Sequence, residues 1–317
     1  MTLIHPPRAP WDGRKFADPD VTADGKTRAS VPLVALRTLW FNTGTLCNLT
    51  CANCYIESSP SNDRLAYLEC ADVTGYLDQI TELGLATQEI GFTGGEPFMN
   101  PSIIALLTAS LERGYRTLVL TNAMPVMTRH ADALLTLRAR YGAKFVLRVS
   151  IDHYRRELHE EERGHHTWLP TLRGLKWLAD NGFAINVAGR LRWGDGEAAM
   201  RDGFASLFSA EGIALNAADP IELVIFPEMD AAASVPEITT ECWGILHKSP
   251  GDVMCASSRM VVRRKGDATP TIASCTLLPY EAQFDLGNRL DGALGPVKLN
   301  HPHCAKFCVL GGGRCSG

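Results

Sequence analysis

Short apolar segments alternate with amphipathic segments between about residues 36 and 226, and this alternation constrains the fold more than any other feature. Strands that alternate with helices form a parallel sheet with right-handed crossover connections. We predict six strands, at residues 36–41, 89–93, 116–121, 145–151, 184–188 and 221–226. The helices predicted between them cover residues 73–83, 102–113, 129–141, 171–181 and 197–209.

This order of elements predicts an α/β fold, a partial (β/α)6 TIM-like barrel. Eight units would close a full barrel, and an open doubly wound sheet would give the same pattern of elements. In either fold, the functional loops follow the carboxyl ends of the strands. Gly114 and Gly182 each follow a predicted helix, where a left-handed residue commonly ends the helix.

Changes in periodicity and cysteine content along the chain predict three regions. Residues 1–34 show no periodicity and are expected to form an irregular arm, whereas residues 35–230 carry the barrel pattern. Residues 231–317 hold six of the ten cysteines and have poor helical periodicity. This last region is typical of a small module organised around metal.

Charge and hydropathy narrow the choice of partners. The net charge of −4 weighs against nucleic acids and acidic lipids, which bind to basic surfaces. No apolar run approaches the length of a membrane span, and the first residues contain no apolar stretch of signal-peptide length. We therefore expect a cytoplasmic protein that binds neither nucleic acid nor a membrane. In a reducing location, ten cysteines favour metal or redox chemistry over disulfides.

Three cysteines follow the first predicted strand at the spacing C-x3-C-x2-C: Cys47, Cys51 and Cys54. A [4Fe–4S] cluster normally takes four cysteine ligands, so three thiolates leave one iron open to a chelating ligand. The alternatives are a structural zinc site, which requires four closed ligands, and three buried thiols without metal.

Together with Gly94, Gly95 and Glu96 after the second predicted strand, this cysteine loop resembles the signature of the radical S-adenosylmethionine (SAM) enzymes. The resemblance implies that the open iron chelates the methionine moiety of SAM. Glu96 and the Gly94–Gly95 backbone would then hold the methionine ammonium, because a carboxylate pairs with a cation and glycines allow close approach. A strand-ending turn is the alternative interpretation of the same residues.

Residues at the ends of later strands extend the resemblance. Ser150 and Asp152, followed by Arg163-Gly164, are similar to an S-[IL]-D…R-G stretch of radical SAM enzymes that modify peptides and proteins. Ser150 and Asp152 would thus contact SAM, although Asp152 could equally be a turn or helix-cap residue. Arg190 could face the SAM carboxylate or pair with a surface acid, and Asn122 is a pocket candidate by position.

Two local features need a separate interpretation, a departure from the family pattern beside Cys54 and a charged run. The family often has an aromatic residue directly before the third cysteine, whereas this chain has Asn53 there and Tyr55 after Cys54. A backbone contact to adenine would survive this change, but a ring contact would not. The charged run from His153 to His166 is interpreted as a solvated helix face, with only His153 kept as an acid–base candidate.

The C-terminal cysteines resemble the auxiliary-cluster tails called SPASM or twitch. Cys255 and Cys275 flank a predicted hairpin, and a glycine-flanked group follows. Six cysteines are too few for two fully ligated clusters, which need about eight. One auxiliary [4Fe–4S] cluster is expected, with a zinc site as the alternative. Its ligands would be drawn from Cys255, Cys275, Cys304, Cys308 and Cys315.

Some details stay open at this point. The spacing C-x3-C, in place of the commoner C-x2-C, leaves undecided which of Cys304 and Cys308 is a ligand. Cys70 and Cys242 have no assigned role, and a buried free thiol is the default for both.

The resemblance implies an enzyme that reductively cleaves SAM to a 5′-deoxyadenosyl radical and abstracts hydrogen from a peptide or a small molecule. An auxiliary cluster could accept the substrate electron, which would make the net reaction an oxidation, or it could position the substrate. A flavodoxin- or ferredoxin-like protein would supply the electron. The alternatives are a methyl- or sulfur-transferring relative and a non-catalytic iron–sulfur electron carrier.

Overall fold

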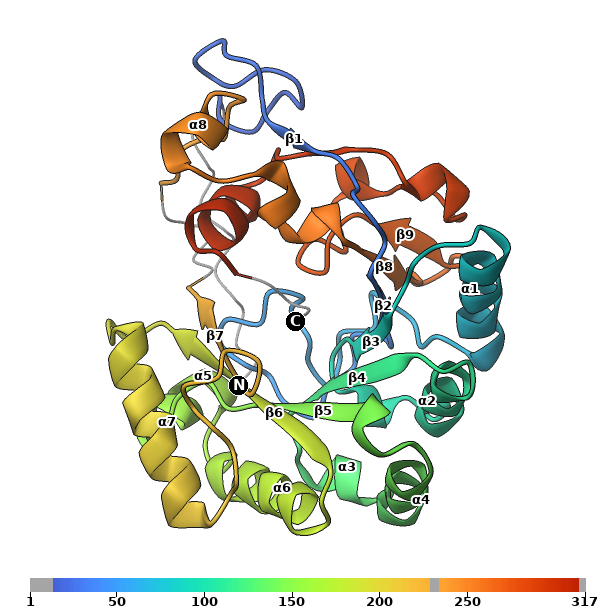
Figure 1. The fold of residues 1–317 in the computed structure, drawn as a ribbon, viewed down its shortest axis with the longest axis vertical. Coiled ribbons are helices and arrows are strands. Elements are labelled where there is room, and N and C mark those ends of the chain that lie inside the picture. Colours follow the sequence, from blue (N-terminus) through green and yellow to red (C-terminus); the bar gives the residue numbers. More distant parts are fainter. Residues whose placement is uncertain (1–13, 229–233, 314–317) are drawn as a thin grey trace.

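A computed structural model describes residues 14–228 and 234–313. Its centre is an eight-stranded sheet in the order β7-β6-β5-β4-β3-β2-β8-β9 (Figure 1). From β2 to β7, neighbours in the chain are neighbours in the sheet and run parallel. This sequential order is that of a barrel rather than of a doubly wound sheet. The sheet stays open between β7 and β9, so the predicted partial barrel is confirmed.

The six predicted parallel strands are all present. The predicted bounds of β3 and β4 agree with the structure, and β6 continues three residues further than predicted. Most of their residues are buried because helices cover one face and the barrel interior covers the other. The strands are β2 (Thr38–Asn42), β3 (Glu89–Thr93), β4 (Arg116–Thr121), β5 (Phe145–Ser150), β6 (Ala184–Leu191) and β7 (Leu223–Pro227).

Most of the helices lie on the outer side of the curved sheet, whereas α8 lies apart from it in the C-terminal region (Figure 1). In α2, for example, Ile103, Leu106 and Leu107 are fully buried and form the face that packs on the sheet. Gly114 and Gly182 both have positive φ, as predicted for residues that end helices. The helices are α1 (Cys70–Glu82), α2 (Ile103–Glu112), α3 (Pro125–Thr128), α4 (Ala131–Tyr141), α5 (Arg156–Arg163), α6 (Trp168–Asp180), α7 (Glu197–Glu211) and α8 (Cys242–Leu246).

The C-terminal residues extend the central sheet. The predicted hairpin is formed by β8 (Ser258–Val262) and β9 (Thr271–Ala273), which pair antiparallel. Strand β8 also pairs parallel with β2, which the sequence did not predict. Opposite this edge, a short π-helix (Cys304–Leu310) approaches β7, with the rings of Phe226 and Phe307 5.7 Å apart. The C-terminal segment therefore lies across the opening of the barrel (Figure 1).

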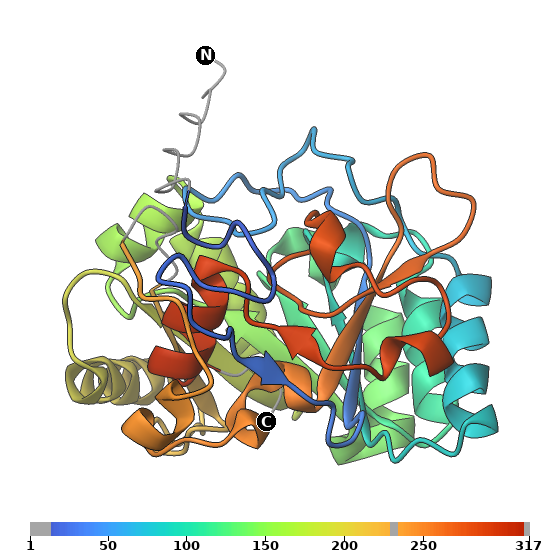
Figure 2. The same cartoon turned by 90° about the horizontal axis from the view of Figure 1, so that it is seen from above.

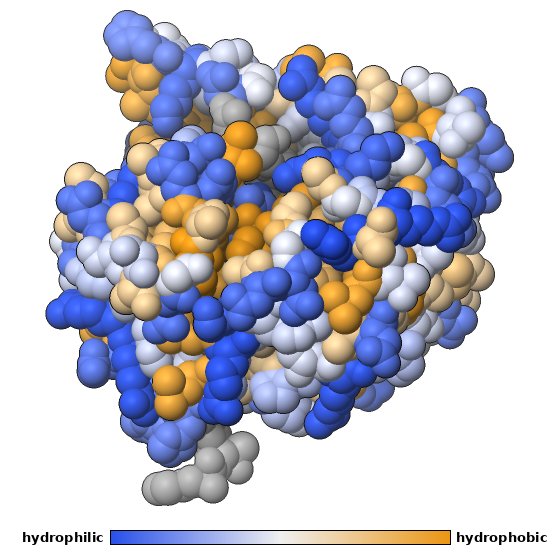
Figure 3. Space-filling view, turned by 60° about the horizontal axis from the view of Figure 1, so that its bottom comes forward, coloured by the Kyte–Doolittle hydropathy of each residue, from blue (hydrophilic) through white to orange (hydrophobic). Residues whose placement is uncertain are grey.

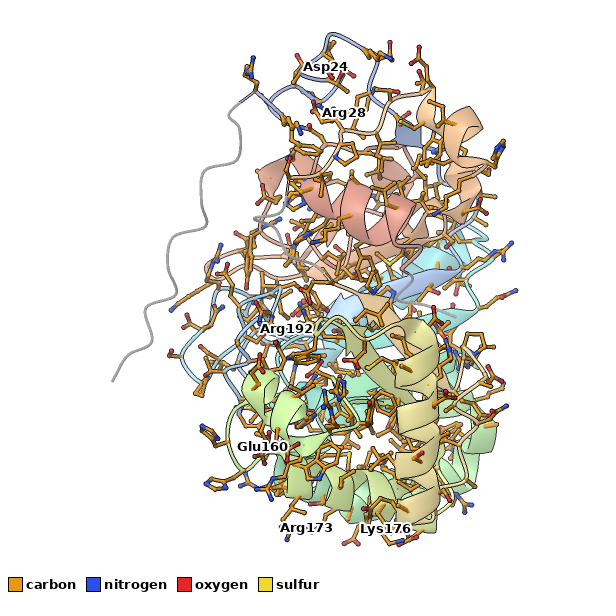
Figure 4. All side chains as sticks on the ribbon, turned by 90° about the vertical axis from the view of Figure 1, so that its left-hand side faces the viewer. Asp24, Arg28, Glu160, Arg173, Lys176 and Arg192 are labelled. Atoms are coloured by element: carbon orange, nitrogen blue, oxygen red, sulfur yellow. The ribbon has the colours of Figure 1, made fainter. Side chains whose placement is uncertain are left out.

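The described part of the N-terminal arm packs on the C-terminal region. Strand β1 (Ser30–Val31) pairs antiparallel with β10 (Val297–Lys298), and the two lie side by side in Figure 2. Arg28, labelled in Figure 4, is buried and donates to Glu237 over 2.6 Å. The described part of the arm is thus fixed by a strand pair and a buried ion pair.

One face of the molecule carries a central apolar region (Figure 3). On one face, apolar side chains gather in a hollowed central part and hydrophilic side chains surround them (Figure 3). Within the described residues, none of the helices is long and apolar enough to cross a membrane.

Candidate active site

One pocket opens at the carboxyl edge of the parallel strands and collects residues from six strand ends. Nine of the residues singled out in the sequence line it: Cys47, Cys51, Cys54, Gly94, Gly95, Asn122, Ser150, Asp152 and Arg190. This is the edge at which barrels of this kind place their functional loops. Residues that were not proposed from the sequence also line the pocket, among them Arg148, Glu162 and Phe226.

The three cysteines of the first group lie on the loop after β2. Burial, partly offset by nearby backbone or cationic groups, raises the pKa of Cys47 and of Cys51 to about 12, and the neighbouring thiols contribute to both shifts. Buried thiolates of this kind require a positive centre, and metal ligation supplies one. All described cysteines are free thiols. Cys47, Cys51 and Cys54 are the only cysteines among the described residues that line the pocket, a donor set that fits a cluster with one open iron.

No single-ion site is visible in residues 14–228 and 234–313: no group of three or more His, Cys, Asp or Glu side chains there is arranged to hold one metal ion. The cysteine loop differs from a structural zinc site in its donor set as well. Structural zinc requires four closed ligands, and the described pocket wall offers three thiols.

The glycine pair after β3 docks directly on the cysteine loop. The Gly95 N–H donates to Gly44 O over 2.8 Å, and the Glu96 N–H donates to Leu46 O over 3.1 Å. Gly94 has φ +141°, and a Cβ on Gly95 would overlap the carbonyl of Leu46. The close approach of these two backbones therefore requires glycine at position 95.

Gly95→Ala should disrupt this contact and weaken SAM binding. The added methyl would force the two backbones apart, at a cost of about 1–3 kcal/mol for overpacking. Gly75→Ala on α1 is the matched control, because a Cβ there meets nothing within 4 Å. Thermal unfolding and SAM titration would compare the variants. A Gly95→Ala protein as stable and as tight in SAM binding as Gly75→Ala would contradict the expected overlap.

Glu96 lies behind the pocket wall rather than in it. Its carboxylate is 1% exposed and accepts hydrogen bonds from Thr121 Oγ1 over 2.9 Å and from the N–H of Asn122 over 2.8 Å. Burial raises the pKa of Glu96 to about 7 despite these donors. The side chain therefore joins the ends of β3 and β4, and of the three residues in the motif only Gly94 and Gly95 line the pocket.

Asp152 and Arg163 form a buried ion pair beside the cysteine loop. Arg163 Nε donates to Asp152 Oδ2 over 2.5 Å, and Arg163 Nη2 lies 3.4 Å from Oδ1. Burial alone would raise the pKa of Asp152, but the guanidinium beside it holds that pKa below its usual value. Arg163 also interacts electrostatically with Cys51, so the pair links the end of β5 to the cysteine loop.

Arg190 pairs with acids at the pocket rim. Its Nη1 donates to Glu162 Oε1 over 3.0 Å, and its Nη2 lies 3.6 Å from Glu228 Oε1. Glu162 comes from α5, the charged run that the sequence predicted to be a solvated face. That prediction is wrong for His159 and Glu162, which are 0% and 2% exposed. Helix α5 has almost no apolar residues, so it buries polar ones where it packs against the strand ends.

His153 does not join the pocket lining. Its imidazole is fully buried, its Nε2 lies 3.3 Å from Asp195 Oδ2, and its Nδ1 accepts the N–H of Arg155. Burial lowers its pKa, although Asp195 acts in the opposite direction. These contacts give His153 a structural position between β5 and the β6–α7 loop.

The second cysteine group lies in the C-terminal region. Burial raises the pKa of Cys255 to about 11, and it raises that of Cys304 further, with the nearby Cys255 adding to the effect. Cys275 and Cys308 pack against the same apolar cluster. Cys304 and Cys308 are four residues apart in one helix, so they share a face. Cys315 lies outside the described residues.

A buried cation accompanies this group. Arg259 is 1% exposed and, among the described residues, donates to the backbone carbonyls of Cys255, Ser258, Ala293 and Gly295. No carboxylate in the described part of the chain forms an ion pair with it. Cys255 and Cys275 are its electrostatic neighbours. An unpaired buried charge is costly, so an anionic group held by these thiolates fits the site.

The family follows from a comparison with protein-family models. Residues 41–206 match the model of the radical SAM superfamily, which covers more than half of the chain. The chain therefore belongs to the radical SAM superfamily and is an enzyme. The family implies a [4Fe–4S] cluster and SAM, and the cysteine pocket described above fits both.

Curated relatives match part of the chain. The antilisterial bacteriocin subtilosin biosynthesis protein AlbA of Bacillus subtilis is 29% identical over 177 residues, which are 56% of this chain and 37% of AlbA. A GTP 3′,8-cyclase of Synechocystis is 27% identical over 143 residues, 44% of this chain and 41% of the cyclase. The chain thus spans less than half the length of these relatives.

Solved structures share the fold over a larger part of the chain. SuiB of Streptococcus suis bound to SAM has a TM-score of 0.57 at 15% identity, covering 80% of this chain and 63% of SuiB. SuiB bound to its precursor peptide SuiA has a TM-score of 0.59 at 14% identity, covering 82% and 65%. The AdoMet-bound structure of anSMEcpe has a TM-score of 0.57 at 14% identity, covering 80% and 77%.

Proposed function

We propose that this enzyme reductively cleaves SAM and abstracts a hydrogen atom from a peptide substrate, in an oxidative modification of that peptide. The observation that carries the proposal is the pocket in which Cys47, Cys51 and Cys54, the Gly94–Gly95 backbone and the strand-end polar residues meet. A non-catalytic electron carrier would have no use for the glycine pair or for this pocket. A methyl- or sulfur-transferring reaction remains the alternative on the same fold.

The cysteines and the glycine pair of the pocket have separate roles in this proposal. Cys47, Cys51 and Cys54 would hold the [4Fe–4S] cluster, and the Gly94–Gly95 backbone would accept the methionine ammonium. When bound, the cluster and SAM would supply a 5′-deoxyadenosyl radical, so the radical chemistry comes from the cofactors rather than from side chains. The chain's own residues orient the ligands and keep water away from them.

Four polar side chains at the strand ends complete the SAM contacts in this proposal. Asn122 and Ser150 would contribute hydrogen bonds from the ends of β4 and β5. Asp152 would act from its ion pair with Arg163. Arg190 would reach SAM only with the part of its guanidinium that Glu162 and Glu228 leave available.

A peptide is favoured over a small molecule by the relatives. SuiB has been seen with a precursor peptide, and AlbA is named for biosynthesis of a bacteriocin. A flavodoxin- or ferredoxin-like protein is proposed as the electron donor.

Residues 35–230 are proposed as the SAM-binding unit and residues 231–317 as a module for one auxiliary [4Fe–4S] cluster. Its proposed ligands are Cys255, Cys275, Cys304 and Cys308, since the shared helical face of the last two allows both to bind. Cys315 stays a candidate in place of one of them. A zinc site in this module is the alternative.

The central experiment is anaerobic reconstitution with iron and sulfide, reduction with dithionite, and addition of SAM. Formation of 5′-deoxyadenosine would support the radical reaction, and its absence at full iron content, with and without peptide, would contradict it. Deuterated peptide mixtures then test the substrate class. Deuterium in 5′-deoxyadenosine supports a peptide substrate, whereas transfer only from deuterated small metabolites contradicts it.

Arg259→Gln should move the reduction potential of the auxiliary cluster to more negative values, by tens of millivolts. Removing a nearby buried positive charge destabilises the more negative, reduced state of a cluster. Arg259→Lys, which keeps the charge but loses the guanidinium fork, should stay close to the wild-type potential. A potentiometric titration followed by EPR compares the two. Equal potentials in all three proteins would exclude this electrostatic role.

A further inference from the structure

The turn between the second and third cysteines of the SAM-binding loop is held by one acidic residue of α5. The N–H of Asn53 donates to Glu162 Oε1 over 2.9 Å, and Asn53 Nδ2 donates to Glu162 Oε2 over 2.9 Å. The N–H of Ala52 also donates to the main-chain carbonyl of Glu162 over 2.7 Å. Three hydrogen bonds therefore connect this two-residue turn to a single position of the neighbouring helix.

The carboxylate of Glu162 is buried and charge-compensated. It is 2% exposed, and Arg190 and Arg192 approach its two oxygens to 3.0 Å and 3.4 Å. Figure 4 views this side of the molecule, with Arg192 near the helix that carries Glu160. A buried carboxylate with two arginines and two amide donors has few other conformations open to it, because moving would leave charges unpaired.

The same residue connects the loop to the strand ends. Arg190 is at the end of β6, and Arg163, the next residue along α5, pairs with Asp152 at the end of β5. The cysteine loop is therefore tied through α5 to two strands that line the pocket. Position 53, where the family often has an aromatic residue, here carries an amide that suits a carboxylate partner.

We propose that Glu162 is a positioning residue: by binding the backbone and side chain of Asn53, it fixes the directions of the Cys51 and Cys54 thiolates toward the SAM-binding cluster. The inference rests on the proposed cluster at Cys47, Cys51 and Cys54. Glu162 would act on the ligand loop without touching iron. Residues that orient metal ligands in this way commonly change metal affinity or activity about 10- to 100-fold when replaced.

The geometry predicts which substitutions fail and which restore function. In Glu162→Gln, one oxygen becomes an NH2 group, which opposes a donor of Asn53 or of an arginine, and the negative charge that Arg190 and Arg192 face is lost. In Asn53→Asp, two carboxylates face each other. In the double variant Glu162→Gln/Asn53→Asp, the glutamine NH2 donates to the aspartate, and the negative charge moves across the contact without being lost.

The experiment measures SAM affinity and the cluster spectrum of the reconstituted full-length protein. SAM binding is followed by the change that SAM causes in the EPR spectrum of the reduced protein, which isolates the cluster with an open iron. We expect Glu162→Gln and Asn53→Asp each to weaken SAM affinity about tenfold or more and to alter the SAM-bound spectrum. The double variant should return to within about threefold of wild type, as coupled neighbours do.

Two further variants keep the test decisive. Glu157→Gln, an exposed residue in the first turn of the same helix, should match wild type in every measurement. Asn53→Ala removes only the side-chain amide and leaves the backbone hydrogen bond, so it serves if Glu162→Gln does not fold. Wild-type affinity in Glu162→Gln, or in Asn53→Ala where Glu162→Gln does not fold, would overturn the proposal, as would a double variant no better than the singles. Wild-type protein without any SAM-responsive cluster would instead refute the proposed function.

Discussion

Simultaneous replacement of Cys47, Cys51 and Cys54 by alanine is expected to abolish formation of 5′-deoxyadenosine. These residues are the only cysteines that line the described pocket, and an iron–sulfur cluster is held by thiolates. Bound iron should fall by about four atoms per chain, while an auxiliary cluster would keep about four. Iron and sulfide analysis, with liquid chromatography of the SAM products, measures both effects.

Cys70→Ala provides the matched control for this experiment. Cys70 begins α1 and does not line the pocket, so its removal should leave iron content and SAM cleavage unchanged. If the triple variant kept its full iron content, the cluster would be held elsewhere. If Cys70→Ala lost the same four atoms, Cys70 would be an additional ligand.

Arg163→Met is expected to lower the free energy of unfolding by about 3–5 kcal/mol, because it leaves the buried Asp152 carboxylate without its cation. The side chains of Asp152 and Arg163 are 4% and 14% exposed, so water cannot replace the lost partner. Denaturant unfolding of the apoprotein measures the effect. Arg173→Met on α6 is the control, since Arg173 is exposed and its removal should change stability by less than about 0.5 kcal/mol.

The pH dependence of stability gives this prediction a second readout. The pKa of Asp152 is lowered in the folded protein, so its contribution is fully present above the unfolded pKa, near 3.9. The contribution is lost as the pH falls through the folded pKa. The difference between wild type and Arg163→Met should therefore be large at pH 7 and shrink in acid. A difference that does not depend on pH would mean that the ion pair is not its source.

The barrel could be predicted from the sequence because its signals are local. The apolar runs that become β3 and β4 end where the predicted strands end, and the cysteine and glycine motifs follow strands directly. Residues after successive parallel strands meet at one edge, so Asn122 could be placed in the pocket before the fold was known, whereas Ser150 was assigned by the family resemblance. The bounds of β3 and β4 needed no long-range information.

The missed features depend on contacts between distant segments. Helix α5 shows almost no apolar face, so nothing local separates the buried Glu162 from its exposed neighbours. The only available signal was Arg163 in the motif after Asp152, which marks a charged contact near the strand end. Strand β8 was predicted as half of a hairpin, and its pairing with β2 could not be inferred from either segment alone.

That pairing bears on how the protein is made. Strand β2, which leads directly into the cysteine loop, acquires its second neighbour only when β8 has been synthesised, about 220 residues later. Until then the emerging chain carries an open strand edge, which invites pairing with other chains. We expect the nascent protein to need protection at this edge, and the metal-binding loop to settle only after β8 has left the ribosome. Cofactor loading at this loop would then wait until β8 has emerged.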